Sequence, residues 1–457
     1  MTLLASWLDH GARYQAALMA LRTPRGAWSY GQLAELAGHG GGFLRSEGVA
    51  VDEIVGFAAG PVELALAALA CSAAGAVLLP LDPRLPDAAW AHWRALAGGR
   101  LRRLTVLPAE WFSFAAPCTI AGKVDDLALV IATSGSAGVP KGVMLTRGNL
   151  DAAAAAANWR LPLAAGDVWL GCLPLYHIGG ISLLYRCLRA GATLLLHEGF
   201  SAAAVWRDLH QHAVTHISLV PVMLARLLEV AAGRSPPADL RHALIGGGAL
   251  SRPLLETALA AGWPICPTWG MSESAAQAAT LTCPGNDWQP GQVGEFLPGL
   301  EGRIAADGRI HLKGAQVMAG YLNPQRRRGY GLDDGWLPTA DLGRFDAAGR
   351  LTVLGRADDV LVSGGVNVHP HEVENCLAAC PGVSDVAVTA VADPVWGDAL
   401  VALIVGPAES HVVDQWLRQH LPAAKRPRRI RRIGCLPRNS MGKLERAHLQ
   451  RLALGLS

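Results

Sequence analysis

The sequence predicts an α/β protein with a large N-terminal domain of parallel-type sheets layered with helices and a small α+β C-terminal domain. Short buried runs rich in leucine, isoleucine and valine alternate with longer helical stretches, a pattern typical of parallel strands joined by helical crossovers. Four such runs occupy residues 127–132, 192–196, 216–220 and 242–245. With 457 residues, of which 51% are hydrophobic and 17% charged, the chain can bury the cores of about two or three domains.

The character of the sequence changes after about residue 290. Turn pairs such as Asp307-Gly308 and Asp334-Gly335 then separate short strands, so we expect a β-rich subdomain over residues 290–355. We end the N-terminal domain, 1–355, there and assign 356–457 to the C-terminal domain. In the C-terminal domain, residues 370–379 are predicted to form a helix, and residues 386–391 and 400–405 to form strands.

Charge, cysteine usage and hydropathy argue against several classes of protein. A net charge of +3 predicts no nucleic-acid partner, and nine cysteines without C-x-x-C spacing indicate neither a disulfide framework nor a metal site. Residues 1–15 lack the apolar core of a signal peptide, so we expect a reducing, cytoplasmic setting. The uncharged segment 64–81 imitates a membrane span, but Gly75 interrupts it. A buried helix at 62–74 followed by a strand at 76–80 explains this segment better.

The strongest chemical signal is a loop of glycines and small hydroxyl residues directly after the predicted strand 127–132. Its sequence is Thr133-Ser134-Gly135-Ser136-Ala137-Gly138-Val139-Pro140-Lys141-Gly142. Glycines and hydroxyls allow backbone N–H groups and side-chain oxygens to surround phosphate oxygens closely, and Lys141 adds a positive charge. The loop is not the P-loop of NTPases, because Pro140 precedes the lysine and Gly142 follows it.

This loop resembles the signature [ST]-S-G-T-[TS]-G-x-P-K-G of the acyl-adenylate-forming superfamily. That superfamily contains acyl-CoA synthetases, carrier-protein adenylation domains and firefly-type luciferases. Ser136 stands where threonine is usual and Ala137 where a hydroxyl is usual, so we expect weaker contacts with phosphate. Within the superfamily, the nearest resemblance is to the o-succinylbenzoate–CoA ligases of menaquinone synthesis.

The resemblance extends over nearly the whole chain, with the family's motifs in the family's order. It implies ATP, Mg²⁺ and coenzyme A as cofactors and co-substrates. It also implies an ATP- and AMP-binding set made up of Thr133, Ser134, Gly135, Ser136, Gly138, Lys141, Gly246, Gly247, Gly248, Trp269, Gly270, Ser272, Asp341 and Arg356. In this set Asp341 accepts hydrogen bonds from both ribose hydroxyls, and Trp269 replaces a tyrosine that stacks on adenine.

The same resemblance assigns four catalytic residues: Lys443, His177, Lys141 and Glu273. Glu273 helps hold Mg²⁺ on the ATP phosphates, and His177 borders the acyl pocket beside the reacting carboxylate. Lys443, in the motif P-x-x-x-x-G-K-[IVL]-x-R, bridges that carboxylate and the α-phosphate in the adenylating conformation only. The mobile C-terminal domain then turns about a hinge at Asp358 and presents Ser363, Gly364 and Gly365 to the pantetheine thiol.

The identity of the acid depends on fewer residues. Arg186 and Gln277 match positions that contact the acid in some o-succinylbenzoate–CoA ligases, although Arg186 could equally be an exposed helix residue. A CoA ligase for another aryl or alkyl acid, a stand-alone enzyme that loads a carrier-protein thiol and a luciferase-like oxygenase are the alternatives. The basic run 425–432 is either a solvated face or a binding site for coenzyme A phosphates. The sequence does not decide whether the protein forms a homodimer.

Overall fold

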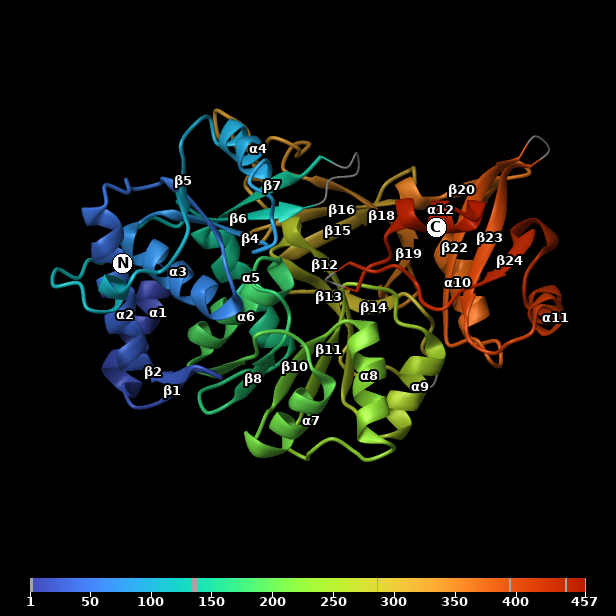
Figure 1. Ribbon diagram of the computed structural model, residues 1–457, viewed down its shortest axis with the longest axis horizontal. Coiled ribbons are helices and arrows are strands. Elements are labelled where there is room, and N and C mark those ends of the chain that lie inside the picture. Colours follow the sequence, from blue (N-terminus) through green and yellow to red (C-terminus); the bar gives the residue numbers. More distant parts are fainter. Residues whose placement is uncertain (1–2, 134–138, 286, 394–395, 440–441, 457) are drawn as a thin grey trace.

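The computed structural model describes residues 3–133, 139–285, 287–393, 396–439 and 442–456. The described elements form a large N-terminal body that carries two sheets and a smaller C-terminal body built on a third sheet (Figure 1). This arrangement confirms the predicted α/β class. Within the described ranges, no helix is both long enough and apolar enough to cross a membrane.

The first sheet has six strands in the order β17-β7-β6-β4-β3-β5. They are β3 (Ile54–Ala58), β4 (Val77–Leu81), β5 (Leu101–Leu104), β6 (Leu127–Thr133), β7 (Lys141–Thr146) and β17 (Gly320–Tyr321). Strands β5, β3, β4 and β6 are parallel, whereas β6 and β7 form an antiparallel hairpin. The helices of this region are α1 (Leu3–Gln15), α2 (Tyr30–Ser46), α3 (Pro61–Ala74) and α4 (Ala89–Leu96).

Helix α3 and strand β4 account for the segment that imitates a membrane span. The helix begins with a proline at its first position and ends at Gly75, whose φ of 71° forms a left-handed C-cap. Strand β4 follows after one residue and is buried throughout. The predicted buried helix and buried strand are therefore confirmed.

The second sheet is long and combines parallel and antiparallel strands. Its order is β15-β16-β18-β19-β14-β13-β12-β11-β10-β8-β9-β1-β2. The parallel part contains β8 (Val168–Gly171), β9 (Thr193–Leu196), β10 (His216–Leu219), β11 (His242–Ile245) and β12 (Ile265–Met271), with β1 (Met19–Thr23) and β2 (Gly26–Ser29) beyond β9. Its helices are α5 (Arg147–Arg160), α6 (Ile178–Ala190), α7 (Ala202–Gln211), α8 (Pro221–Ala231) and α9 (Arg252–Ala260).

The antiparallel part of this sheet occupies the region in which we expected a β-rich subdomain. It consists of β13 (Ala276–Thr280), β14 (Gln292–Phe296), β15 (Leu300–Ile304), β16 (Arg309–Gly314), β18 (Leu337–Phe345) and β19 (Leu351–Arg356). Strand β13 pairs with β12, so these strands continue the parallel part. The carboxyl ends of parallel strands meet at one edge of a sheet, and there the loops after β11 and β12 carry several predicted site residues.

The C-terminal body has a sheet and hydrophobic clusters of its own. Its elements are β20 (Leu361–Ser363), β21 (Val366–Val368), α10 (Pro370–Ala378), β22 (Asp385–Asp393), β23 (Gly397–Val405), α11 (Ser410–His420), β24 (Arg429–Arg432) and α12 (Arg446–Leu454). The predicted helix and both predicted strands of this region coincide with α10, β22 and β23. Strands β22 and β23 form a long antiparallel pair against which α10 and α12 pack.

Candidate active site

The hairpin of β6 and β7 is the stem of the predicted phosphate loop, and Thr133 pairs with Lys141 across it. The Thr133 hydroxyl donates to the Lys141 carbonyl oxygen at 3.4 Å. His92 Nε2, on α4, lies 2.8 Å from the Pro140 carbonyl oxygen. The predicted loop residues Ser134, Gly135, Ser136 and Gly138 fall outside the described residues. The hairpin holds the two ends of the loop side by side.

A tyrosine that the sequence analysis did not single out joins two predicted site residues. The Tyr321 hydroxyl donates to Glu273 Oε1 at 2.8 Å, and its ring centroid lies 4.8 Å from Lys141 Nζ. Burial, and next the negative charge of Glu273, raise the pKa of Tyr321, so the phenol stays protonated at neutral pH. Tyr321 belongs to a two-residue strand beside β7, and no sequence signal distinguishes it from an ordinary packing residue.

The predicted ribose acceptor, Asp341, lies in a polar cluster made by three strands. Asp341 on β18 and Arg356 on β19 are cross-strand partners, with 3.8 Å between Asp341 Oδ1 and Arg356 Nη1. The Trp269 indole N–H, from β12, donates to Asp341 Oδ2 at 2.8 Å. Burial raises the pKa of Asp341, and the Trp269 hydrogen bond and the Arg356 charge oppose that shift. The guanidinium of Arg356 also donates to both Asp358 oxygens at 2.9 Å.

Glycines beside this cluster lack room for a side chain. A Cβ on Gly246 would lie 2.6 Å from Thr268 Cγ2, and one on Gly270 would lie 1.7 Å from the Ala276 carbonyl oxygen. Gly247, between Gly246 and Gly248 in the turn after β11, has a φ of 75°. Crowding therefore explains Gly246 and the left-handed backbone explains Gly247, whereas a Cβ on Gly248 would make only ordinary contacts with Pro221. Ser272 and Glu273 follow β12 in a 3₁₀ turn that spans Ser272–Ser274.

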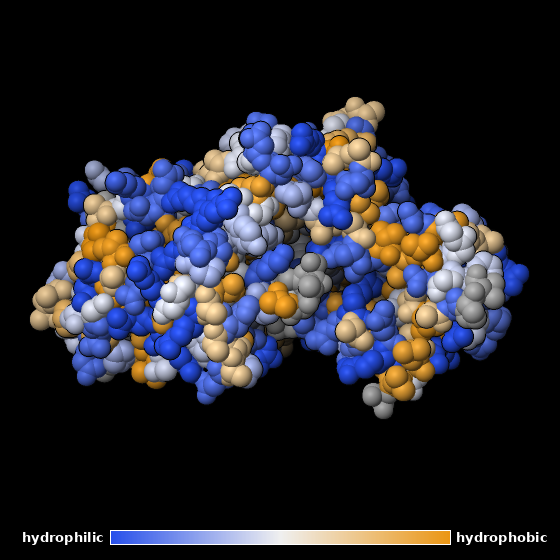
Figure 2. Space-filling model, turned by 90° about the horizontal axis from the view of Figure 1, so that it is seen from above, coloured by the Kyte–Doolittle hydropathy of each residue, from blue (hydrophilic) through white to orange (hydrophobic). Residues whose placement is uncertain are grey.

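Lys443 extends from the C-terminal body toward this cluster. The backbone N–H of Asn439 donates to the Lys443 carbonyl oxygen at 2.9 Å, and the Lys443 N–H donates to Asn439 Oδ1 at 3.1 Å, so the lysine is held on a tight turn. A Cβ on Gly442 would lie 2.9 Å from Val222 Cγ1 and 3.1 Å from Val220 Cγ2, both at the start of α8. The turn therefore contacts the N-terminal body directly. Figure 2 shows the surface hollowed where the two bodies meet.

The charges around Lys443 come from both bodies. Partial removal from water lowers the pKa of Lys443, whereas the negative charges of Asp341 and Glu273 raise it. The side chain still keeps contact with solvent, as expected in an open cleft. Burial and, to a smaller extent, the Lys443 charge lower the pKa of His177 to about 4. The structure thus brings together Lys443, His177, Glu273 and Asp341.

His177 precedes helix α6, and Arg186 lies farther along the same helix. Arg186 is only 3% exposed, which rules out the exposed helix position considered from sequence. Its guanidinium lies 5.4 Å from the Trp169 ring centroid, and no described residue supplies it with a hydrogen-bond acceptor. Burial lowers its pKa to about 10. It borders a cavity of about 10 Å³, room for about one water molecule, lined also by Ser182, Tyr185, Ala275, Leu150, Ala153 and Ala154.

Gln277 and Ser363 each bury a polar atom that lacks a partner in the described part of the chain. Gln277 Nε2 donates to Thr280 Oγ1 at 2.8 Å, which leaves Gln277 Oε1 unpaired, and Ser363 Oγ is likewise unpaired. Ser363 ends β20, and Gly364 and Gly365 form the turn to β21 with φ angles of 56° and 76°. Ser363, Gly364 and Gly365 thus lie in the C-terminal body.

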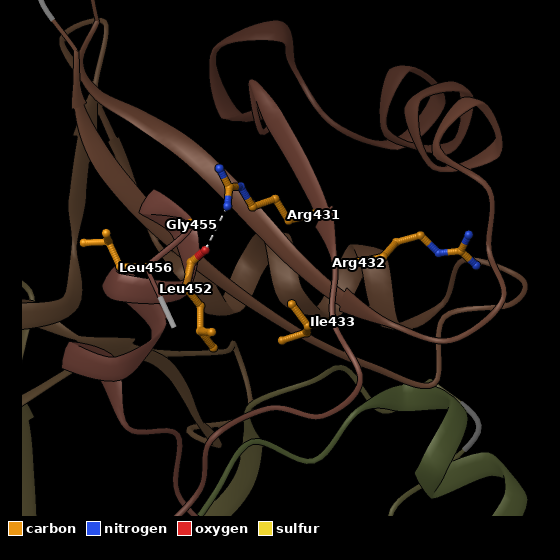
Figure 3. Close-up of a pocket in the computed structure, with 6 residues that line it drawn as sticks. All are labelled: Arg431, Arg432, Ile433, Leu452, Gly455 and Leu456. Atoms are coloured by element: carbon orange, nitrogen blue, oxygen red, sulfur yellow. Dashed lines mark hydrogen bonds between the residues drawn. The ribbon is translucent and has the colours of Figure 1, made fainter.

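A cavity in the C-terminal body is not part of this cluster. It measures about 450 Å³ and lies between β24 and the end of α12 (Figure 3). Arg431, on β24, donates to the Leu452 carbonyl oxygen at 3.2 Å and so caps the end of α12. No predicted catalytic or nucleotide-binding residue lines this cavity, which is open to solvent.

Comparison with known proteins identifies the family. Residues 8–101 and 101–322 match the AMP-binding enzymes, and residues 372–443 match the AMP-binding enzyme C-terminal domain. The chain belongs to the AMP-binding enzyme family. A 2-succinylbenzoate–CoA ligase of Bacillus mycoides (strain KBAB4) is 36% identical over 340 residues, which cover 72% of this chain and 71% of the relative.

Solved structures of the o-succinylbenzoate CoA synthetase from Bacillus subtilis resemble nearly the whole chain. The complex with the acyl-adenylate intermediate OSB-AMP gives a TM-score of 0.86 at 30% identity and 97% coverage of both chains. The complex with ATP and magnesium gives 0.87 at 29% identity, covering 97% of this chain and 98% of that chain. A double mutant bound to a product analogue gives 0.72 at 30% identity and 97% coverage of both chains. The present arrangement is therefore more similar to the first two complexes.

The residues present fit a magnesium ion that is held mainly by the substrate. The described residues contain no group of three or more His, Cys, Asp or Glu side chains that could hold a metal. Glu273 supplies one carboxylate beside the phosphate-loop stem. Mg²⁺ is usually bound by one or two carboxylates together with phosphate oxygens and water, so one carboxylate at this position suffices.

Proposed function

We propose that the protein is an AMP-forming ligase that joins o-succinylbenzoate to coenzyme A. The observation that carries the proposal is that Lys443 of the C-terminal body is close enough to Asp341, Glu273 and His177 of the N-terminal body for their charges to interact. A cation at that point suits a reaction in which negative charge develops on oxygen atoms. The named relatives support the choice of acid.

In the first half-reaction the carboxylate of the acid attacks the α-phosphorus of ATP, and pyrophosphate leaves. Adenylation removes the carboxylate charge that resists nucleophilic attack and supplies AMP as a leaving group. Lys443 and Lys141 stabilise the charge on the phosphate oxygens. With a pKa of about 4, His177 is neutral at pH 7 and can border the carboxylate without adding a charge. Glu273 would hold Mg²⁺, which neutralises phosphate charge when bound.

In the second half-reaction the coenzyme A thiol attacks the acyl carbonyl carbon, and AMP leaves. We infer that the C-terminal body first turns about Asp358, which withdraws Lys443 and brings the Ser363-Gly364-Gly365 turn to the thiol path. In the present arrangement Asp358 is held by both its oxygens to Arg356. The lower TM-score against the product-analogue complex supports two arrangements of such chains.

The basic run 425–432 is our candidate for the segment that binds the phosphates of coenzyme A. The Arg428 guanidinium lies 3.9 Å from the ring centroid of Trp396, an exposed aromatic residue. A Cβ on Gly364 would lie 2.9 Å from the same ring, so Arg428 is close to the proposed thiol path. Lys425 is already paired with Glu372. We therefore assign the phosphate contact to Arg428. The nine free cysteines suit the cytoplasm, where coenzyme A is kept as a thiol.

Arg186 is our candidate for the residue that binds the second carboxylate of the acid. A buried guanidinium without an acceptor is costly, and a carboxylate ligand would remove that cost. Because the cavity beside Arg186 holds about one water molecule, the side chains around it must move apart to admit an aromatic acid. The proposal therefore includes opening of the contact between α5 and α6.

The proposal is tested by acid-dependent release of pyrophosphate from Mg·ATP, with o-succinylbenzoate, benzoate and an alkyl acid compared side by side. We expect the highest kcat/KM for o-succinylbenzoate and formation of its CoA thioester when free coenzyme A is added. If no acid of the panel causes AMP to be released, the proposed reaction class is wrong. Adenylation without transfer to free coenzyme A would favour a carrier-protein acceptor.

Substitution of Arg186 tests the assignment of the acid. In Arg186→Gln, we expect KM for o-succinylbenzoate to rise about tenfold or more, the loss typical of a hydrogen bond to a charged group. KM for benzoate, which lacks the second carboxylate, should change little. Arg186→Lys, which keeps the charge, should lose less than the glutamine variant. Equal losses for both acids would show that Arg186 only supports the fold.

A further inference from the structure

The indole of Trp269 and the carboxylate of Asp341 form a hydrogen bond. The sequence motifs that contain these two residues do not predict it. The two residues are 72 positions apart, on β12 and β18, and their Nε1–Oδ2 distance is 2.8 Å. The Trp269 indole is half-buried. Its N–H is thus directed at the side chain to which we assign the ribose hydroxyls.

This contact restricts the rotation of the Asp341 side chain. One oxygen, Oδ2, is held by the indole, and the other, Oδ1, lies 3.8 Å from Arg356. Arg356 is itself held by the two oxygens of Asp358 at 2.9 Å. A carboxylate has about four acceptor sites, and the orientation of its plane decides which of them face a ligand. The two oxygens can accept hydrogen bonds from a pair of neighbouring hydroxyls only over a narrow range of carboxylate orientations.

We propose that Trp269 is a positioning residue that orients Asp341, and that it thereby sets how strongly the enzyme prefers a ribonucleotide to a deoxyribonucleotide. The inference rests on the proposed function, because it takes Asp341 as the acceptor of the ribose hydroxyls. It differs from a stacking role for Trp269, since stacking acts on the adenine ring and is the same for ATP and its deoxy analogues.

Trp269→Phe separates the two roles, because phenylalanine keeps an aromatic face and lacks the N–H. For this variant we expect the ratio of kcat/KM for ATP to that for 2′-deoxy-ATP, and the same ratio for 3′-deoxy-ATP, to fall about five- to tenfold. Trp269→His should recover part of the ratio, because imidazole Nε2 takes the ring position of indole Nε1. Ratios are insensitive to the fraction of protein that is active, so partial misfolding does not obscure the result.

Two controls make the outcome decisive. Trp288→Phe removes an indole N–H that donates to the Gln292 carbonyl oxygen at 3.0 Å, outside the site, and should leave both ratios unchanged. Binding of AMP and 2′-deoxy-AMP, measured by calorimetry, should show the same loss of preference without catalysis. If Trp269→Phe loses activity equally with all three nucleotides, the positioning role is wrong. If Asp341→Ala keeps the wild-type ratios, the ribose assignment itself, and with it this part of the proposed function, fails.

Discussion

Lys443 illustrates how the surroundings of one residue set its chemistry. Its ammonium is partly removed from water, which lowers its pKa, and it faces the carboxylates of Asp341 and Glu273, which oppose that shift. The two acids thus partly offset the effect of burial, and the nearby charge of Arg356 acts in the same direction as burial. Tyr321, which the sequence analysis did not single out, donates a hydrogen bond to one of these acids, Glu273.

At this scale we predict that Lys443→Ala lowers the rate of adenylation by about 100- to 1,000-fold, the loss typical of a group that stabilises transition-state charge. Thioester formation from a supplied acyl-adenylate and coenzyme A should remain near the wild-type rate. Pyrophosphate release and thioester appearance measure the two steps separately. Lys313→Ala, which removes a half-buried lysine next to Trp336, is the matched control. Equal loss of both steps would disprove the assignment of Lys443.

Within the parallel part of the long sheet, two neighbouring strands begin with histidines, of which one is buried and the other half-buried. His216 opens β10 and is paired in register with His242 on β11 and with Trp169 on β8. Its ring lies 4.8 Å from the Trp169 ring and 5.0 Å from the His242 ring. Burial, and next the charge of His242, lower the pKa of His216 to about 3. These strands are therefore stable with a neutral imidazole at their start.

The histidine of β10 predicts sensitivity to acid. In the unfolded chain the pKa of a histidine is near 6.5, whereas the pKa of His216 in the folded protein is about 3. Between these two pH values the unfolded state binds a proton at this residue and the folded state does not. Stability should therefore fall as pH decreases through this window, by up to about 1.4 kcal/mol per pH unit for this residue.

Urea unfolding of His216→Phe at pH 7 and pH 5 measures the effect. The loss of stability between these pH values should be smaller than in the wild type by up to about 2 kcal/mol. The exposed His411, changed to Gln, provides the control. An unchanged difference between pH 7 and pH 5 in the phenylalanine variant would mean that other groups cause the acid sensitivity.

In the whole molecule, the proposed site takes residues from both bodies. A side chain on Gly442 would collide with Val220 and Val222 at the start of α8, and the φ of 71° at Gly442 is one that residues with a side chain rarely adopt. Two separately built cores are thus joined at the site through a residue that has no side chain. The contact belongs to the arrangement that we assign to adenylation.

Gly442→Val should disturb this contact and little else. The added side chain clashes with α8, so we expect adenylation to fall at least tenfold, because a loss of about 1.4 kcal/mol of docking free energy has that effect. Thioester formation from supplied acyl-adenylate should persist, since that step uses the other arrangement. Gly434→Ala is the control, as a Cβ there meets nothing within 4 Å. Loss of thioester formation as well would indicate misfolding or a single arrangement for both steps.

Local patterns in the sequence determined the α/β class, the helix and strand at 62–80, the strand before the phosphate loop and the chemical character of each motif. Periodicity, glycine turns and proline positions act over a few residues, so they can be read without knowledge of the fold. Only the tertiary structure decided that Tyr321 donates a hydrogen bond to Glu273 and that Trp269 donates one to Asp341. It also decided that Arg186 is buried and that Lys443 reaches the N-terminal body. Such contacts join residues far apart in the chain, and the packing of whole elements, rather than local preference, brings them together.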